Sequence, residues 1–239
     1  MRVALVFYGL LRYVDVCYPL WKKNVIDTLG IEDIYMHTFR DEKEDIKYNG
    51  STGQHSYKVG PSVLRDFHDL YKPRVVMYSN YEDVKKTNQW FEPTERVRYC
   101  VSNTYNIQAI CFSIYNAVNL VPDKYDYVIL SKIDQVFWNP ITKLEINDNE
   151  ILTSNFMFYK DWDGKYWSAT DFFAIGNLNT IKKYAALGIN YKQLYENGIT
   201  FHIETLVGEN LKYMGVKPIV KFRYPEDQHY YRDHESLMN

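Results

Sequence analysis

The sequence of 239 residues predicts an α/β fold in which helices flank a mixed, mainly parallel central sheet. Three observations support this fold class. Short runs rich in β-branched and aromatic residues, at 3–8, 33–38, 74–78 and 127–132, are typical of buried strands. Segments with helical apolar spacing alternate with these runs, as in folds with parallel strands joined by crossovers. Strand-like runs become denser in the second half, which indicates a mixed sheet.

In the first half, each strand is followed by a distinct segment. After strand 3–8 a helix is expected over 13–29, with Asp27 and Gly30 near its end. After strand 33–38 the stretch 40–61 is polar and contains three turn signals, so we expect a long loop there. A short helix over 62–71 then precedes strand 74–78.

A long amphipathic helix, or two short ones, is expected over 94–120, because apolar residues lie three or four apart on one stripe. Beyond it we expect strands at 127–132, continuing into 133–137, and at 151–158 and 171–175. Helices are expected at 178–187 and 203–214. No repeat or Ser/Gly linker divides the chain, so a single domain is the simplest organisation.

Charge and composition exclude several classes of protein. The net charge is −2 and Lys and Arg are spread evenly, whereas nucleic-acid-binding proteins usually show a basic excess, so no nucleic-acid partner is expected. No apolar run is long enough for a signal peptide or a transmembrane segment. Cys17, Cys100 and Cys111 have neither metal-ligand nor disulfide spacing and are expected to be free, buried thiols. A cytoplasmic protein fits these features best.

The stretch with the most chemical information is the end of strand 127–132, where Lys132 and Asp134 lie two residues apart. In open α/β sheets, ligands bind outside the carboxyl ends of strands. Residues two apart on a strand point to the same side, so both side chains could face one ligand. A surface strand end with a salt-bridged lysine is the alternative. The chain also has 23 Tyr and 12 Phe, which suits a sugar-binding cleft or a Tyr-rich core.

Five stretches, taken in order, resemble a group of GT-A glycosyltransferases found in surface-polysaccharide gene clusters and in large DNA viruses. These stretches are 6–12, 33–39, 125–134, 171–177 and 204–211. In that group a strand ends in a basic residue, a variable residue and an aspartate, at the position of the DXD motif. The resemblance spans about residue 3 to 216. It implies one GT-A (Rossmann-like) domain over 1–239, with a nucleotide-sugar-binding half at 1–139 and an acceptor-binding half at 140–239.

The resemblance implies a hexosyl or pentosyl transferase that moves a sugar from a nucleotide-sugar donor, with a UDP-sugar expected, to a hydroxyl of a glycan or glycoconjugate, as in polysaccharide biosynthesis. The leaving diphosphate gains negative charge, which most GT-A enzymes offset with Mn²⁺ or Mg²⁺ held by DXD carboxylates. Here Lys132 replaces the first Asp. We expect Asp134 to hold the metal with a C-terminal histidine, His229 or His234, as a further ligand. Alternatively, Lys132 and Arg12 supply the positive charge directly.

The remaining candidates follow from the same resemblance. Gly9 is expected to let the backbone pass close to the nucleotide, Arg12 to bind a phosphate, and His37 to contact the nucleotide or the sugar. An inverting reaction needs a base, for which Asp171 is the first candidate and Glu204 the second. Each of these residues also has a purely structural alternative, as a turn glycine, salt bridge, core histidine or helix cap.

Three other functions stay open at this point. A non-catalytic carbohydrate-binding protein fits the aromatic content, and an inactive glycosyltransferase relative fits the missing first Asp. A different nucleotide enzyme, such as a nucleotidyltransferase, fits the sheet. The turn after strand 3–8 has neither a Gly-rich dinucleotide fingerprint nor a P-loop, which argues against NAD-dependent and P-loop chemistry.

Overall fold

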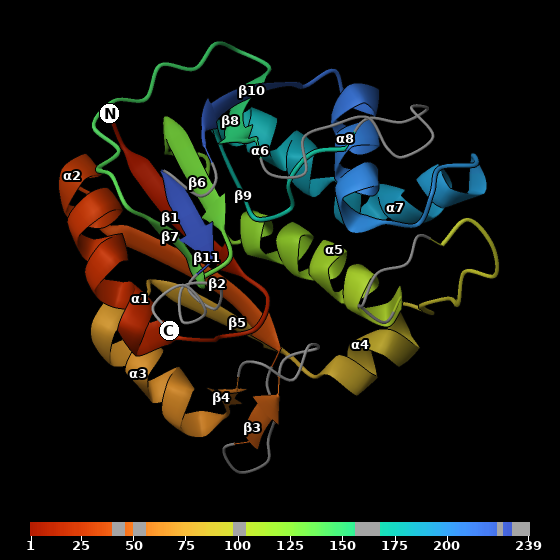
Figure 1. Ribbon diagram of the computed structural model, residues 1–239, viewed down its shortest axis with the longest axis horizontal. Coiled ribbons are helices and arrows are strands. Elements are labelled where there is room, and N and C mark those ends of the chain that lie inside the picture. Colours follow the sequence, from red (N-terminus) through yellow and green to blue (C-terminus); the bar gives the residue numbers. More distant parts are fainter. Residues whose placement is uncertain (40–45, 50–55, 98–103, 156–167, 224–226, 231–239) are drawn as a thin grey trace.

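The computed structural model describes residues 1–39, 46–49, 56–97, 104–155, 168–223 and 227–230. Its centre is a seven-stranded sheet with the order β10-β8-β9-β6-β1-β2-β5 (Figure 1). These strands are β1 (Val3–Tyr8), β2 (Asp33–Phe39), β5 (Val75–Ser79), β6 (Tyr127–Ser131), β8 (Glu150–Ser154), β9 (Phe173–Gly176) and β10 (Lys217–Phe222). Strand β9 runs antiparallel to β6 and β8, and the other neighbouring pairs are parallel. The predicted mixed, mainly parallel sheet is confirmed.

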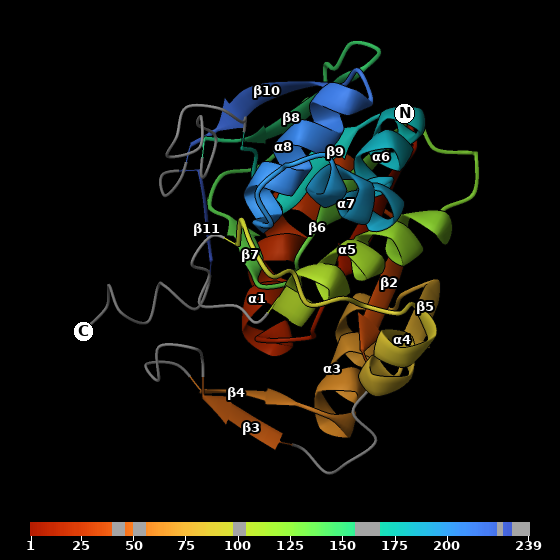
Figure 2. The same ribbon diagram turned by 90° about the vertical axis from the view of Figure 1, so that its right-hand side faces the viewer.

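Helices cover both faces of this sheet, as the two views show (Figures 1 and 2). On one face lie α1 (Val14–Trp21) and α3 (Pro61–Tyr71), and on the other α5 (Thr104–Asn119), α6 (Leu178–Ala185), α7 (Leu187–Glu196) and α8 (Ile203–Tyr213). The side chains of β1 alternate between the two cores: Val3, Leu5 and Phe7 pack with α1 and α3, whereas Ala4, Val6 and Tyr8 pack with α5 to α8. A strand buried on both faces needs the unbroken apolar run seen at 3–8.

The helix expected over 13–29 is confirmed, with an internal change of geometry. Helix α1 passes into a π-helical segment, η1 (Lys22–Ile26), and then into α2 (Asp27–Leu29). Gly30 closes it in the left-handed conformation, with φ of 62°, which glycine adopts without strain. The strands at 33–38 and 74–78 and the helix at 62–71 also agree with β2, β5 and α3 to within a residue or two.

The long loop expected over 40–61 is wrong in part. Strands β3 (Ile46–Asn49) and β4 (Ser56–Val59) form an antiparallel hairpin within it, while 40–45 and 50–55 lie outside the described residues. The turn signals were assigned to a loop, although Asn-Gly next to β-branched and aromatic residues is equally typical of a hairpin. The structure also contains α4 (Tyr81–Thr87), capped by the Asn80 side chain, which the sequence analysis did not identify.

Boundaries differ at three further elements. Helix α5 begins at Thr104, and residues 94–97 are not helical, so the expected start at 94 is wrong; 98–103 lie outside the description. Strand β9 begins at Phe173 rather than 171, and the expected strand 151–158 is described only to Ser154, in β8. Helix α7 and strand β10 were not expected, and β11 (Gln228–Tyr230) pairs with β7 (Gln135–Phe137) as a separate two-stranded sheet.

The cysteine prediction is confirmed where it can be followed. Cys17 and Cys111 are free and fully buried, and burial raises the pKa of both thiols, so they remain protonated and inert. Cys100 lies outside the described residues. Within the described part of the chain, no helix combines the length and apolar character needed to cross a membrane.

Gly188, in the first turn of α7, allows this helix to pack closely on α5. A Cβ atom at this position would lie 2.3 Å from Tyr115 Cβ and 2.7 Å from the Cys111 carbonyl oxygen. Gly188→Ala is therefore expected to destabilise the fold by about 1–3 kcal/mol, the usual cost of overpacking. Urea unfolding measures it, with Ile189→Ala as the control, because the Ile189 side chain is exposed. An unchanged midpoint for Gly188→Ala would contradict this packing.

Candidate functional site

The sheet brings three loops to one edge. Strands β1 and β6 are parallel neighbours, with Phe7 opposite Ser131, and antiparallel β9 places Phe173 opposite Ser131 from the other side. The segments after Tyr8, after Ser131 and before Phe173 therefore meet at the carboxyl ends of the parallel strands. This edge is where ligands bind in open α/β sheets.

Lys132 and Asp171 form an ion pair at this edge. Lys132 Nζ lies 2.5 Å from Asp171 Oδ2, and the two side chains are 13 % and 2 % exposed. The backbones are also joined, because Lys132 N donates to the Phe172 carbonyl oxygen at 3.0 Å. Tyr8, the last residue of β1, donates its hydroxyl to the Asp171 carbonyl oxygen. Asp171 is thus fixed by the strand on each side of it.

Glu204 joins this pair from the first turn of α8. Its side chain is largely buried, and Oε2 lies 3.0 Å from Nε2 of His202. The other ring nitrogen of His202, Nδ1, shares a hydrogen bond with Thr205 Oγ1 at 3.2 Å. Ala169 N donates to the Glu204 carbonyl oxygen at 2.9 Å, which ties the segment before Asp171 to the start of α8. The two predicted base candidates therefore lie in one cluster.

The environments of these two carboxylates shift their pKa values in opposite directions. Burial raises the pKa of Asp171; the charge and hydrogen bond of Lys132 oppose this shift, and the charge of Glu204 adds to it. Burial also acts to raise the pKa of Glu204, but the hydrogen bond and charge of His202 outweigh it, so this pKa lies below its ordinary value. Carboxylates held apart in this way are typical of sites with distinct acid–base roles.

Asp134 pairs with Arg12 rather than with Lys132. Arg12 Nη2 lies 3.1 Å from Asp134 Oδ2, and the Asp134 side chain is 1 % exposed. The turn that carries Asp134 is fixed because Gln135 N donates to the Lys132 carbonyl oxygen and Trp21 Nε1 to the Ile133 carbonyl oxygen, both near 3 Å. Two cations and two buried carboxylates thus alternate along this edge.

The described residues do not by themselves fit a divalent metal ion. Asp134 Oδ1 is buried and has no hydrogen-bond partner among the described residues, but its other oxygen is engaged by Arg12. In the part of the chain that the structure describes, no group of three or more His, Cys, Asp or Glu is placed to hold a metal. His229 lies on β11 with its Cα opposite Val136, and its side chain, like all of His234, falls outside the description. The metal therefore stays a prediction.

His37 and Gly9 are joined by a residue that the sequence analysis missed. Gly9 has a φ of 87°, its N–H donates to Ser113 Oγ on α5 at 2.8 Å, and the space where its Cβ would stand is open. His37 is fully buried, with Nδ1 2.7 Å from Ser113 Oγ and Nε2 3.0 Å from Ser79 Oγ. Burial lowers the pKa of His37 to about 4, so the ring is neutral. These contacts hold the Gly9 turn from below, and a contact of His37 with a ligand stays a prediction.

Three supporting residues could have been found only by weak signals. Tyr8 is the one residue with a polar tip in an otherwise apolar strand, and Ser113 is a polar residue on the buried stripe of α5. His202 lies two residues before Glu204, just ahead of a helix. In each case the residue type indicates a buried hydrogen bond, but only the fold identifies its partner.

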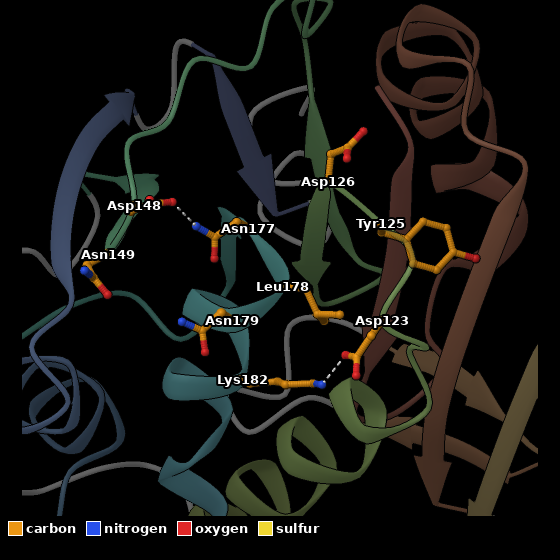
Figure 3. A pocket seen from close by; sticks show the side chains of 9 residues that line it. All are labelled: Asp123, Tyr125, Asp126, Asp148, Asn149, Asn177, Leu178, Asn179 and Lys182. Carbon is orange, nitrogen blue, oxygen red and sulfur yellow. Dashed lines mark hydrogen bonds and ion pairs between the residues drawn. The ribbon is translucent and has the colours of Figure 1, made fainter.

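The hollow that Figure 3 shows lies at the opposite edge of the sheet, near the start of β6. Its volume is about 610 Å³. Lys182 reaches Asp123 at 2.5 Å, and Asn177 donates to Asp148 at 3.2 Å, so polar groups of its lining bond to one another. Because the charged cluster of Lys132, Asp134 and Asp171 lies at the other end of β6, we place the candidate site there and not in this hollow.

No protein-family pattern matches the sequence, and no curated protein matches it. Solved structures of similar arrangement include galactosyltransferase LgtC in complex with donor and acceptor sugar analogues, with a TM-score of 0.48 and 12 % identity over 91 % of this chain and 73 % of that one. Mouse xyloside xylosyltransferase 1 in its apo form has a TM-score of 0.49 and 10 % identity, over 92 % of this chain and 84 % of that one. An active-site mutant of LgtC has 0.49 and 11 %, over 91 % and 72 %. At TM-scores under 0.5 these likenesses do not determine what this chain binds or catalyses.

Proposed function

We propose that this chain is a GT-A glycosyltransferase that transfers a sugar from a nucleoside-diphosphate sugar to a hydroxyl of a glycan or glycoconjugate. The observation that carries the proposal is the charged edge of the sheet, where Arg12 and Lys132 pair with the buried carboxylates of Asp134 and Asp171. Such an edge offers cations for a diphosphate and a carboxylate for a proton. The resemblance of the five sequence stretches adds the class of donor and of acceptor.

The donor half of the proposal rests on residues 1–139. Arg12 presents a planar fork of N–H donors, so it can hold Asp134 on one side and phosphate oxygens on another. Lys132 supplies a second positive charge from the end of β6. Gly9 leaves open space beside the backbone at the end of β1, where a diphosphate would approach. A UDP-sugar is the donor that we propose.

The acceptor half rests on residues 140–239. In an inverting reaction, the acceptor oxygen bonds to the anomeric carbon and gives its proton to a carboxylate, while the bond from that carbon to the diphosphate oxygen breaks. The departing diphosphate keeps the electron pair, and Arg12 and Lys132 offset its charge. Asp171 is our first choice for the proton acceptor because its raised pKa makes it the stronger base, and Glu204 is the second.

Thermal unfolding in the presence of UDP, GDP, CDP and dTDP tests this proposal, each with Mn²⁺ and with EDTA. We expect one nucleotide, UDP, to raise the unfolding temperature, since a ligand at a hundredfold excess over its Kd stabilises the folded state by about 2.7 kcal/mol. Stabilisation that persists in EDTA would assign the diphosphate to Arg12 and Lys132, whereas its loss in EDTA would assign it to a metal. No shift with any nucleotide would contradict the proposal and favour a carbohydrate-binding protein or an inactive relative.

A further inference from the structure

Lys132 has two possible anionic partners if the proposed function holds, and this inference rests on that function. In the structure its ammonium group contacts Asp171, with Nζ 2.5 Å from Oδ2. In the proposed reaction the same ammonium group binds the donor diphosphate, and Asp171 accepts a proton. A carboxylate that is held in an ion pair is a poor base, so the two assignments conflict unless the ion pair opens.

The geometry allows Lys132 to leave this contact and keeps Asp171 in place. Lys132 is 13 % exposed against 2 % for Asp171, so the ammonium group lies nearer the solvent side of the pair. Its four-carbon stem rotates freely compared with the planar Arg fork. Asp171 cannot follow, because its carbonyl oxygen accepts the Tyr8 hydroxyl and the neighbouring Thr170 carbonyl accepts the Tyr184 hydroxyl at 3.2 Å.

Among the described residues, Lys132 supplies the only cation in printed contact with the Asp171 carboxylate. The other titratable groups that act on it come from four elements packed around it: Tyr8 on β1, Cys111 on α5, Tyr184 on α6, and Glu204 with its partner His202 at the start of α8. Glu204 is the anion among them, and it disfavours a second negative charge on Asp171. Removal of the lysine would therefore leave a buried carboxylate beside another acid.

We propose that the donor diphosphate draws Lys132 away from Asp171, so that donor binding itself converts Asp171 from the partner of an ion pair into a proton acceptor. Loss of the adjacent cation raises the pKa of Asp171, in the same direction as its burial and the charge of Glu204. With an acceptor present, the proton comes from the acceptor hydroxyl. With a nucleoside diphosphate alone, the proton comes from solvent, and binding is accompanied by proton uptake.

Calorimetric titration of the intact chain with UDP, or with whichever nucleoside diphosphate stabilises it, measures this uptake in buffers of different ionisation enthalpy between pH 5 and 8. We expect the wild type to take up more protons than Asp171→Asn, whose difference from the wild type removes the nucleotide's own proton release. Asp171→Asn is also expected to bind the nucleotide about tenfold more tightly, because Lys132 no longer has to leave a buried carboxylate. Lys132→Met should bind more weakly and show no excess uptake.

Asp123→Asn is the matched control, because Asp123 also pairs with a lysine at 2.5 Å but at the opposite edge of the sheet, where both side chains are exposed. It should leave affinity and proton uptake unchanged. Equal proton uptake and equal affinity for the wild type and Asp171→Asn would overturn the exchange and leave the proposed function standing, since the nucleotide still binds. If Asp171→Asn fails to fold, excess uptake that persists in Lys132→Met would overturn it. Absence of binding by every nucleotide would overturn both proposals.

Discussion

Asp171→Asn is expected to lower turnover by a factor of about 10²–10⁴, the usual contribution of a positioned general base, while the nucleotide donor still binds. Asn keeps the shape of the side chain and removes the group that accepts the proton. The fold should survive, because the Tyr8 hydroxyl bonds to the Asp171 backbone rather than to its carboxylate. Initial rates with the donor identified by thermal unfolding, together with the donor Kd, separate the two effects.

The pH dependence of the same rates gives a second measure. A base must be unprotonated to act, so the rate falls as pH falls through the pKa of Asp171. Burial raises this pKa, which places the acidic limb of the profile above the ordinary range for an aspartate, and Asp171→Asn should abolish that limb. Asp69→Asn, on the exposed surface of α3, is the control. If Asp171→Asn were fully active and Glu204→Gln inactive, the base would be Glu204 instead.

Most of the central sheet could be predicted from the sequence because buried parallel strands have a strong local pattern. The runs at 3–8, 33–38 and 127–132 are apolar throughout, and the structure places them side by side as β1, β2 and β6. Strand β10 was missed because Lys217–Phe222 lies at the sheet edge, where polar residues alternate with apolar ones and partial burial blurs the pattern. The hairpin of β3 and β4 was missed for a related reason, since its strands pair only with each other.

The candidate site could be predicted by position but not by pairing. The rule that ligands bind at the carboxyl ends of parallel strands led to Arg12, Lys132 and Asp134, and the structure places their segments at one edge. The sequence analysis expected Lys132 and Asp134 to face one ligand together. Instead the turn after β6 directs Lys132 to Asp171 and Asp134 to Arg12. Sequence spacing does not determine these partners, because they come from β9 and from the loop after β1.

Asp134→Asn is expected to lower kcat/KM by a factor of about 10²–10³, the size of effect seen when a preorganised electrostatic group is removed from a site. The Asp134 carboxylate is buried and engages Arg12 Nη2 at 3.1 Å, so its charge holds the guanidinium at the edge of the sheet. Asn is the informative substitution. Asp134→Ala would remove one partner of a buried ion pair, which costs about 3–5 kcal/mol and confuses loss of folding with loss of function.

A double-mutant cycle with Arg12→Met shows how Asp134 acts. If its role is to position Arg12, the double variant should be no less active than the worse of the two single variants, because both changes disable the same unit. If Asp134 instead holds a metal with residues of the C-terminal tail, the two losses should multiply, and only the Asp134 variant should lose its response to EDTA. Asp27→Asn, which breaks the exposed pair of Asp27 with Lys22, is the control and should change neither rate nor stability measurably. Wild-type activity of Asp134→Asn would contradict the placement of the site at this edge of the sheet.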